Sequence, residues 1–400
     1  MNNIKKNWDI YLFSILSLGL FLFWYVLFAR DPNGNQSGVF FSNATDWFMD
    51  YFNTVYMTVG KTPYTWGYLP ARNYLPIAYL ILYPASFLFE YDVEDVYTSY
   101  DARYYPFPSI IFLLIMILWV GLLFYVLYRA SRRSESSRLL LLVSVLFSCI
   151  MLLNLDRSNE IILTAALAFI FLLKYDAPSI LQRHIAMVAL ALAATLKIVP
   201  AILGIVLIYK KQWKDLLFLI LYAVLLAVLP FFWLEGSFAD NFQALMTNLT
   251  LHAEAYKDGN LGLTAATIFS GLHISGGWLN YLLIAAAALA AWKLHAVWQQ
   301  QLLLLLATVL STGQQGDYTL ILLLLPMITF FNEPVSPKKI GWIVLFVLLL
   351  CPLQYSWTLG PLSLTNIRVA NTACILTALY LIGKGIVMLF HEARRPAPSR

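Results

Sequence analysis

Uninterrupted apolar runs of about 20 residues recur along the whole chain, and no other feature constrains its fold as strongly. Clear examples are residues 10–29, 107–128, 215–234 and 372–390. A helix of this length crosses the hydrocarbon core of a bilayer while satisfying its own backbone hydrogen bonds. Charged residues make up 12% of the 400 residues, whereas soluble domains contain about 25%. The sequence therefore predicts a polytopic α-helical membrane protein.

The predicted architecture is an all-α bundle of about eight full spans and two broken pairs of short helices. Full spans are expected at 10–29, 107–128, 139–155, 161–174, 215–234, 277–292, 340–358 and 372–390. Broken pairs are expected at 185–209 and 302–331, where polar residues interrupt an apolar run. Because no stretch is long and polar enough for a soluble domain, residues 1–400 are expected to form a single domain.

Clusters of Lys and Arg predict the orientation of the spans, because short loops rich in these residues stay in the cytoplasm. Such clusters occur near both termini and at 129–138. They predict a protein of the cytoplasmic (inner) membrane with both termini in the cytoplasm. If 107–128 runs inward, residues 73–89 cannot form another full span. They are predicted as an interfacial or re-entrant helix. Two regions, 31–106 and 235–276, then lie outside.

The remaining composition excludes several classes of protein. Cys149, Cys351 and Cys374 lie in apolar runs, so buried thiols are expected rather than disulfides or metal ligands. The net charge of +5 reflects basic loops and predicts no nucleic-acid partner. No Walker loop, dinucleotide fingerprint or zinc-ligand spacing occurs. The sequence implies the lipid bilayer as a partner, no metal and no firmly implied cofactor, and it leaves the oligomeric state open.

Asp46 and Asp50 lie in a polar, aromatic part of the first outer region. Four residues apart, they would share one face of a helix. In one interpretation Asp46 caps a short interfacial helix and Asp50 is a solvated turn residue. In the other, one carboxylate is a general base at the membrane surface, where partial burial raises its pKa. The spacing leaves both interpretations open.

Cationic side chains occur at two further positions of interest. Lys197 is in the middle of the broken segment 185–209, where an unpaired Lys costs about 2.5–3.5 kcal/mol. Its partner is expected to be a buried carboxylate, carbonyls freed by Pro200, or an anion such as a lipid phosphate. Arg157 and Asn159 lie in a short outer turn. They either cap the flanking spans or bind phosphate and sugar hydroxyls.

Five other residues are candidates for a site. Gln315 and Asp317 lie at the break of the second pair, where polar groups need a polar cavity. His252, in the second outer region, is either solvated or part of the site. Tyr64 and Arg72 belong to the first outer region, whose aromatic rings are suited to stacking on sugars.

Four sequence motifs are similar to motifs of a known protein family. They are Asp46 followed by Gly60-Lys-Thr-Pro-Tyr64, the apolar segment 74–84 that begins with Tyr-Leu-Pro, Lys197-Ile-Val-Pro200, and the polar turn from Ser311 to Asp317-Tyr. Together they resemble glycosyltransferase family 87, the polyprenyl-phosphate-mannose-dependent group of membrane-embedded C-type glycosyltransferases. The polar turn lacks the histidines of the mannosyltransferase pattern and has Gln315 and Asp317 instead.

The resemblance implies a C-type glycosyltransferase that transfers a sugar from a polyprenyl-monophosphate donor. Mannose is the first candidate for this sugar. The acceptor would be a hydroxyl of a lipid or glycan at the outer face of the cytoplasmic membrane. Asp46 would take the acceptor proton during inversion, with Asp50 in reserve, while Lys197 and Arg157 would bind the phosphate. A transporter or flippase of lipid-linked sugars is the alternative, because transporters also contain broken helices. A glycan polymerase or ligase that uses a polyprenyl diphosphate is a third possibility.

Overall fold

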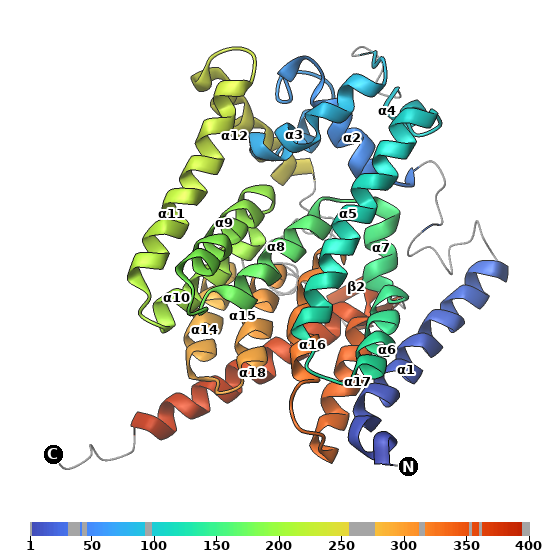
Figure 1. The fold of residues 1–400 in the computed structure, drawn as a ribbon, viewed down its shortest axis with the longest axis vertical. Coiled ribbons are helices and arrows are strands. Elements are labelled where there is room, and N and C mark those ends of the chain that lie inside the picture. The colour runs from blue at the N-terminus through green and yellow to red at the C-terminus, as the bar shows by residue number, and fades with distance from the viewer. Residues whose placement is uncertain are drawn as a thin grey trace. The chain divides into compact units, whose positions relative to one another are not determined.

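The computed structural model describes residues 2–30, 41, 46–92, 98–255, 277–311, 317–351, 354–359 and 362–393. The described chain is helical apart from one antiparallel hairpin of β1 (Gln354–Leu359) and β2 (Leu362–Arg368). Figure 1 shows the helices in chain order, and the chain divides into two compact units. One unit comprises the described parts of 1–31, 127–151 and 259–400, and the other those of 32–126 and 152–258. The predicted single domain is not tested by this division and stays a prediction.

The first unit is built from the N-terminal helix and the C-terminal part of the chain. Its α-helices are α1 (Asn2–Arg30), α6 (Glu135–Leu146), α14 (Gly277–Lys293), α15 (Val297–Ser311), α16 (Leu324–Phe330), α17 (Ile340–Leu349) and α18 (Val369–Ala393), with 3₁₀ helices η7 (Asp317–Leu323) and η8 (Pro337–Lys339). Helix α1 packs on α6 and α17, while α14, α15 and α18 pack on one another. A Cβ at Gly385 would lie 2.5 Å from the carbonyl oxygen of Ala290, so a glycine is needed for this close approach.

The second unit contains every described residue from 46 to 126 and from 152 to 255. Its α-helices are α2 (Met49–Met57), α3 (Pro76–Leu82), α4 (Thr98–Ala102), most of α5 (Pro106–Ala130) and of α7 (Cys149–Arg157), α8 (Ile161–Lys174), α9 (Ile180–Leu196), α10 (Ile205–Tyr209), α11 (Trp213–Val228) and α12 (Phe238–Ala255). Its 3₁₀ helices are η2 (Val59–Lys61), η3 (Leu69–Ala71), η4 (Tyr83–Leu88), η5 (Val199–Gly204) and η6 (Leu229–Trp233). Helix α9 packs between α8 and α11.

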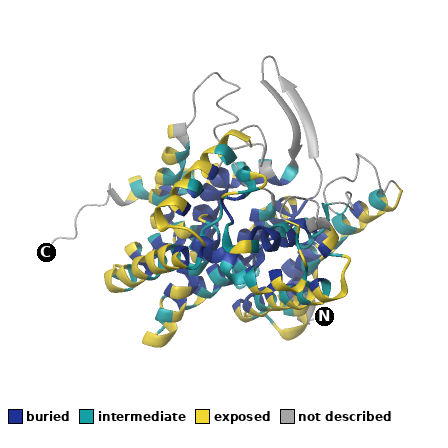
Figure 2. Ribbon diagram, turned by 90° about the horizontal axis from the view of Figure 1, so that it is seen from above, coloured by how far each residue is buried: buried dark blue, intermediate teal, exposed yellow. Residues whose placement is uncertain are grey.

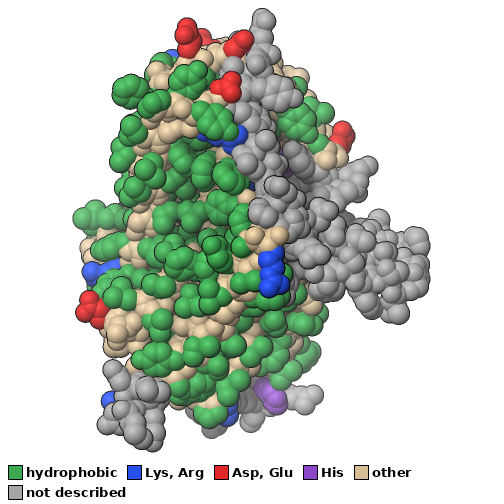
Figure 3. All heavy atoms as spheres, turned by 90° about the vertical axis from the view of Figure 1, so that its right-hand side faces the viewer, with side chains coloured by type: hydrophobic (Ala, Val, Ile, Leu, Met, Phe, Trp, Pro, Cys, Tyr) green, Lys and Arg blue, Asp and Glu red, His purple; other side chains and the backbone are tan. Residues whose placement is uncertain are grey.

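The apolar helices make this a polytopic helical membrane protein, as predicted. Within the described residues, four helices are long and apolar enough to cross a bilayer, and a fifth span is formed if α6 and α7, bent by 55°, count as one. The other apolar helices, α8 and α14 among them, are shorter than a full span. Many helices are exposed on one side and buried on the other (Figure 2). Hydrophobic side chains dominate the described surface in the face shown in Figure 3, as contact with lipid requires.

Helices end within both of the segments that were predicted to be broken pairs. Helix α9 ends at Leu196, Lys197 is extended, and the chain resumes in η5 with Pro200 near its start. Proline lacks a backbone N–H and cannot continue the preceding helix, so the sequence determines this break locally. In the other broken pair, α15 ends at Ser311 and the chain resumes in η7 and α16. The segment predicted not to cross the membrane is divided between the short helices α3 and η4.

Two local predictions differ from the structure. Part of the second outer region, predicted as a loop, is the 18-residue helix α12. Its buried residues Asn241, Leu245 and Asn248 are spaced by four and three positions, as one face of a helix requires. The predicted span 340–358 is helical only through α17 and then enters strand β1.

Candidate functional site

Hydrogen bonds to the backbone of Trp47 and Phe48 hold the segment that carries Asp46. Helix α2 begins at Met49, and Phe48 precedes it in the left-handed region with φ of 65°. The Phe48 N–H donates to the carbonyl of Asp156 (2.7 Å), and Arg103 donates to the carbonyl of Trp47 (3.0 Å). Asp46 is therefore not the N-cap, and the capping interpretation is wrong. The shared helical face is also wrong, because Asp46 precedes the helix that contains Asp50.

Arg157 nevertheless brings the two carboxylates together. Its guanidinium donates to Oδ2 of Asp46 and, over 2.5 Å, to Oδ1 of Asp50. Asn159 donates from Nδ2 to the other Asp50 oxygen (2.8 Å) and accepts the N–H of Ile161 (3.0 Å) on Oδ1. Asn159 thus accepts the first N–H of α8, in line with the capping alternative, and also reaches the carboxylate cluster, while its binding of phosphate or sugar hydroxyls stays a prediction.

The two carboxylates differ in accessibility. The Asp46 side chain is 42% exposed, whereas that of Asp50 is 16% exposed and has both oxygens hydrogen-bonded. Asp50 is in the first turn of α2, so it is not the solvated turn residue of the first interpretation. Of the pair, Asp46 is the carboxylate that an approaching hydroxyl can reach, while Asp50 holds Arg157 and Asn159 in place.

Lys197 lies among aromatic and acidic side chains of the same unit. Its Nζ donates to the Tyr74 hydroxyl (2.8 Å), lies 4.1 Å from the centre of that ring, and is 4.0 Å from Oε1 of Glu160. The buried carboxylate expected as one alternative for Lys197 is therefore present. Extended backbone at the end of α9 directs Lys197 out of the helix that precedes it.

Glu160 is a site residue that the sequence interpretation did not single out. Its side chain is 5% exposed, and within the described structure its Oε1 accepts no hydrogen bond. It lies in the turn between α7 and α8. Burial raises the pKa of Glu160 to about 7, Lys197 opposes this increase, and Asp50 adds to it. A carboxylate between two apolar runs was a usable signal, but its proximity to Lys197 depends on packing.

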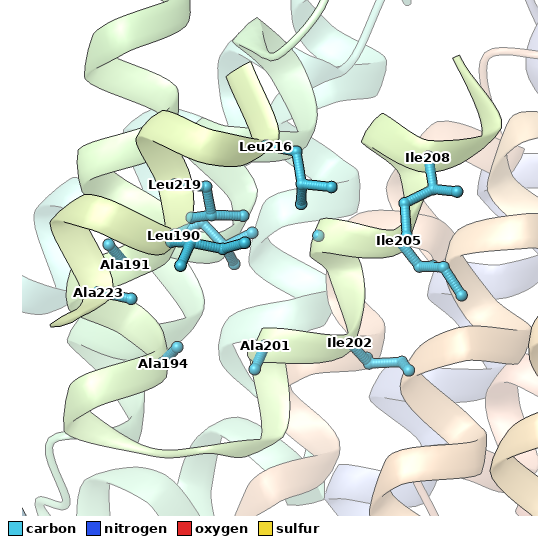
Figure 4. Close-up of a pocket in the computed structure, with 12 residues that line it drawn as sticks. Leu190, Ala191, Ala194, Ala201, Ile202, Ile205, Ile208, Leu216, Leu219 and Ala223 are labelled. Carbon is cyan, nitrogen blue, oxygen red and sulfur yellow. The ribbon is translucent and has the colours of Figure 1, made fainter. Parts of the chain in front are cut away.

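An apolar cavity begins beside the Lys197 break (Figure 4). Its volume is about 340 Å³, and its walls come from α9, η5, α10 and α11. Ala194 and Ala201, which line it, precede and follow Lys197 in the chain by three and four residues. The break between α9 and η5, which contains Lys197, therefore joins two lining residues of the cavity.

Arg72 and Tyr64 belong to a separate buried cluster that holds the first outer region together. Arg72 is 1% exposed, donates to the carbonyl of Pro63 (2.9 Å) and stacks at 3.9 Å on Trp66. Burial lowers the pKa of Arg72 to about 10, and even then the side chain is cationic at neutral pH. The Tyr64 hydroxyl donates to the carbonyl of Tyr74 (2.7 Å), the residue whose ring contacts Lys197.

Helix α12 joins this cluster through two polar side chains. Asn248 donates to the carbonyls of Tyr64 (3.0 Å) and Arg72 (3.1 Å), and His252 Nδ1 is 2.8 Å from the carbonyl of Pro70. His252 is thus on a helix and half-buried rather than in a solvated loop. Burial is the main reason that the pKa of His252 is lowered. These contacts give Arg72, Tyr64 and His252 a structural role in positioning the outer region.

Two predicted site residues remain without a structural description. Gln315 lies outside the described residues, and of Asp317 only the backbone, at the start of η7, is described. The described site therefore consists of Asp46, Asp50, Arg157, Asn159, Glu160, Lys197 and Tyr74, all in one unit.

A known protein family matches more than half of this chain. The model of glycosyltransferase family 87 matches residues 74–326. No curated protein and no solved structure matches the chain. The matched segment includes Tyr74, Arg157, Glu160 and Lys197, and it begins after the two carboxylates. Since it covers more than half of the sequence, the chain belongs to glycosyltransferase family 87.

Proposed function

We propose that this glycosyltransferase takes a sugar from a polyprenyl-monophosphate donor and transfers it to an acceptor hydroxyl. Mannose is the first candidate for this sugar. The acceptor is a lipid or glycan, and the reaction takes place at the outer face of the cytoplasmic membrane. Both termini are in the cytoplasm, as the basic clusters near them predict. Asp46 is the general base, and the sugar is transferred with inversion.

The convergence of Asp46 and Asp50 on Arg157 is the observation that carries this proposal. An exposed carboxylate beside a positioned cation provides a proton acceptor next to a group suited to phosphate. Lys197 adds a second cation in the same unit, linked to the cluster through Glu160 and Asp50. Transfer from a phosphodiester requires a base and cations of this kind.

The reaction balances with these groups alone. The acceptor oxygen attacks the anomeric carbon, the bond from that carbon to the phosphate oxygen breaks, and the acceptor proton passes to Asp46. The leaving polyprenyl phosphate gains one negative charge. Arg157 and Lys197 stabilise this developing charge, which lowers the barrier. Asp50 acts as a positioning residue because it holds Arg157 and Asn159.

The apolar cavity supports a donor with a hydrocarbon carrier. All the residues that line it are apolar, and two of them, Ala194 and Ala201, flank the break that contains Lys197. A phosphate bound to Lys197 would place the first isoprene units of its carrier at this cavity, where burial of each CH₂ contributes about 0.8 kcal/mol.

Direct assay of transfer tests the function. Purified protein is incubated with an acceptor lipid extract and polyprenyl-phosphate mannose, glucose or arabinose, and the lipids are analysed by mass spectrometry. We expect a product one hexose heavier with the mannose donor. Absence of product with every donor, together with movement of the lipid-linked sugar across vesicle membranes, would instead establish the flippase alternative. Product formed only from a polyprenyl diphosphate would establish the polymerase or ligase alternative.

Replacing the cation near the cavity tests donor binding separately. We expect Lys197→Ala to raise the KM for the donor at least tenfold, about 1.4 kcal/mol, with a smaller change in kcat. Lys214→Ala, at an exposed position of α11, is the matched control. An unchanged donor KM in Lys197→Ala would refute the phosphate-binding role.

A further inference from the structure

Glu160 and Lys197 form a buried pair in which Oε1 of Glu160 accepts no hydrogen bond from the described residues. Their charged atoms are 4.0 Å apart, which is beyond hydrogen-bond distance, and the Lys197 ammonium donates to Tyr74 instead. Glu160 is attracted by this cation and repelled by the negatively charged Asp50. A carboxylate in this position is stabilised by one neighbour and repelled by the other, so small changes in local charge alter its protonation.

A phosphate that binds Lys197 would add a second anion beside Glu160. Two anions this close cannot both be charged in a buried site without a large electrostatic cost. A phosphodiester stays ionised across the neutral pH range, so the carboxyl group is the one that changes. Binding of a phosphate at Lys197 therefore favours the protonated form of Glu160.

We propose that Glu160 gates the phosphate site, with an ionised Glu160 competing for Lys197 and a protonated Glu160 leaving Lys197 to the donor phosphate. Donor binding is then accompanied by uptake of one proton on Glu160. This inference rests on the proposed function, because it assumes that Lys197 binds the donor phosphate. It makes Glu160 a positioning residue that acts through Lys197.

Other titratable groups near the pair do not produce the same behaviour. The charged and titratable groups that interact with Glu160 or Lys197 are Asp50, Tyr74, Tyr79 and His252, and Asp50 is itself paired with Arg157. The tyrosines stay neutral, and Arg157 stays cationic between two carboxylates. His252 loses its proton below its usual pKa of 6.5, so it is neutral above that pH. The Glu160 pKa of about 7 places its titration where donor binding would respond.

A non-reactive phosphodiester measures the coupling without catalysis. We would titrate the detergent-solubilised full chain with farnesyl methyl phosphate by calorimetry at pH 6.5 and 8.5. If binding requires protonated Glu160 with a pKa near 7, the Kd of the wild-type protein should rise about 25-fold between these pH values. In Glu160→Gln the Kd should change less than twofold, and at pH 8.5 it should be lower than that of the wild type.

Two further variants separate gating from a structural role. Glu254→Gln, at an exposed position of α12, should keep the wild-type pH dependence. Tyr74→Phe removes the hydroxyl that holds Lys197, so it should shift the Kd at both pH values but keep their ratio.

Three results would overturn the inference. The first is a pH-independent Kd in the wild-type protein, which leaves the phosphate site intact but removes the gate. The second is an unchanged pH dependence in Glu160→Gln with its loss in His252→Gln. The third is absence of binding in every variant at both pH values, which would refute the Lys197 phosphate site and the gate together.

Discussion

The molecule contains two clusters of opposite composition. One carboxylate, Asp9, pairs with two cations, whereas one cation, Arg157, pairs with two carboxylates. In the first unit, Asp9 is fully buried and accepts from Lys339 (2.6 Å) and Arg133 (2.8 Å) on one oxygen, and from the N–H of Ile10 (3.0 Å) on the other. In the second unit, one Arg holds two carboxylates that are 16% and 42% exposed. One cluster is sealed by its partners, and the other keeps an accessible anion.

The difference separates a structural ion pair from a reactive one. Arg133 also donates to the carbonyls of Lys6 and Glu333, so it joins α1 to the chain before η8. Every atom of the Asp9 carboxylate has a partner, and no substrate can reach it. In the Arg157 cluster, by contrast, the geometry leaves Asp46 open to a ligand. Exposure, rather than charge or the number of ion pairs, distinguishes the two clusters.

The strongest test removes the accessible carboxylate. We expect Asp46→Asn to lower kcat by about 10²–10⁴-fold, the usual contribution of a general base, because the amide cannot take the acceptor proton. The melting temperature should hardly change, since the side chain is partly exposed. Transfer measured by mass spectrometry at saturating donor tests this, with Asp101→Asn on α4 as the exposed control. Full activity in Asp46→Asn with an inactive Asp50→Asn would move the base to Asp50.

The corresponding change in the sealed cluster should affect stability instead. Asp9→Asn leaves two cations without their carboxylate, and breaking such a buried pair costs roughly 3–5 kcal/mol. We expect a large drop in melting temperature and in the yield of folded protein, with kcat per folded molecule unchanged. Thermal unfolding in detergent, combined with an active-fraction measurement, checks this. A stable Asp9→Asn variant with reduced kcat would contradict the division between the clusters.

Matched substitutions of the two arginines sharpen the comparison. A Lys cannot bridge two groups with a planar fork, so Arg157→Lys should release one carboxylate and lower kcat/KM about 10–100-fold, with a modest loss of stability. Arg133→Lys should lower the melting temperature and leave kcat/KM unchanged. Equal kinetic losses in both variants would show that the two clusters are not functionally distinct.

The smallest expected effect is the pH dependence of stability caused by Glu160. Its native pKa of about 7 lies above the value of about 4.5 in an unfolded chain, so the native state binds more protons between these values. The contribution of Glu160 to stability is therefore greatest below pH 4.5, falls as the pH rises through this window, and levels off above pH 7. Glu160→Gln should remove this fall. Melting temperatures of both proteins between pH 5 and 8 test it, and parallel curves would contradict it.

Local features of the sequence predicted most of the fold. Span length and hydrophobicity act within a segment, so the membrane-spanning helices and the break at Lys197-Ile-Val-Pro200 could be read directly. Helix α12 was missed because its mixed polar face does not resemble a span. The hairpin was missed because β1 begins inside an apparently continuous apolar run.

The site was only partly predictable, for a physical reason. The sequence by itself determined a helical membrane protein with acidic residues between spans and a cation at a helix break. Tertiary structure alone decided that Arg157 contacts Asp46 and Asp50, 111 and 107 residues away, and that Glu160 lies beside Lys197. Hydrophobic length is a property of a single segment, whereas a contact between charges arises only when the helices that carry them pack.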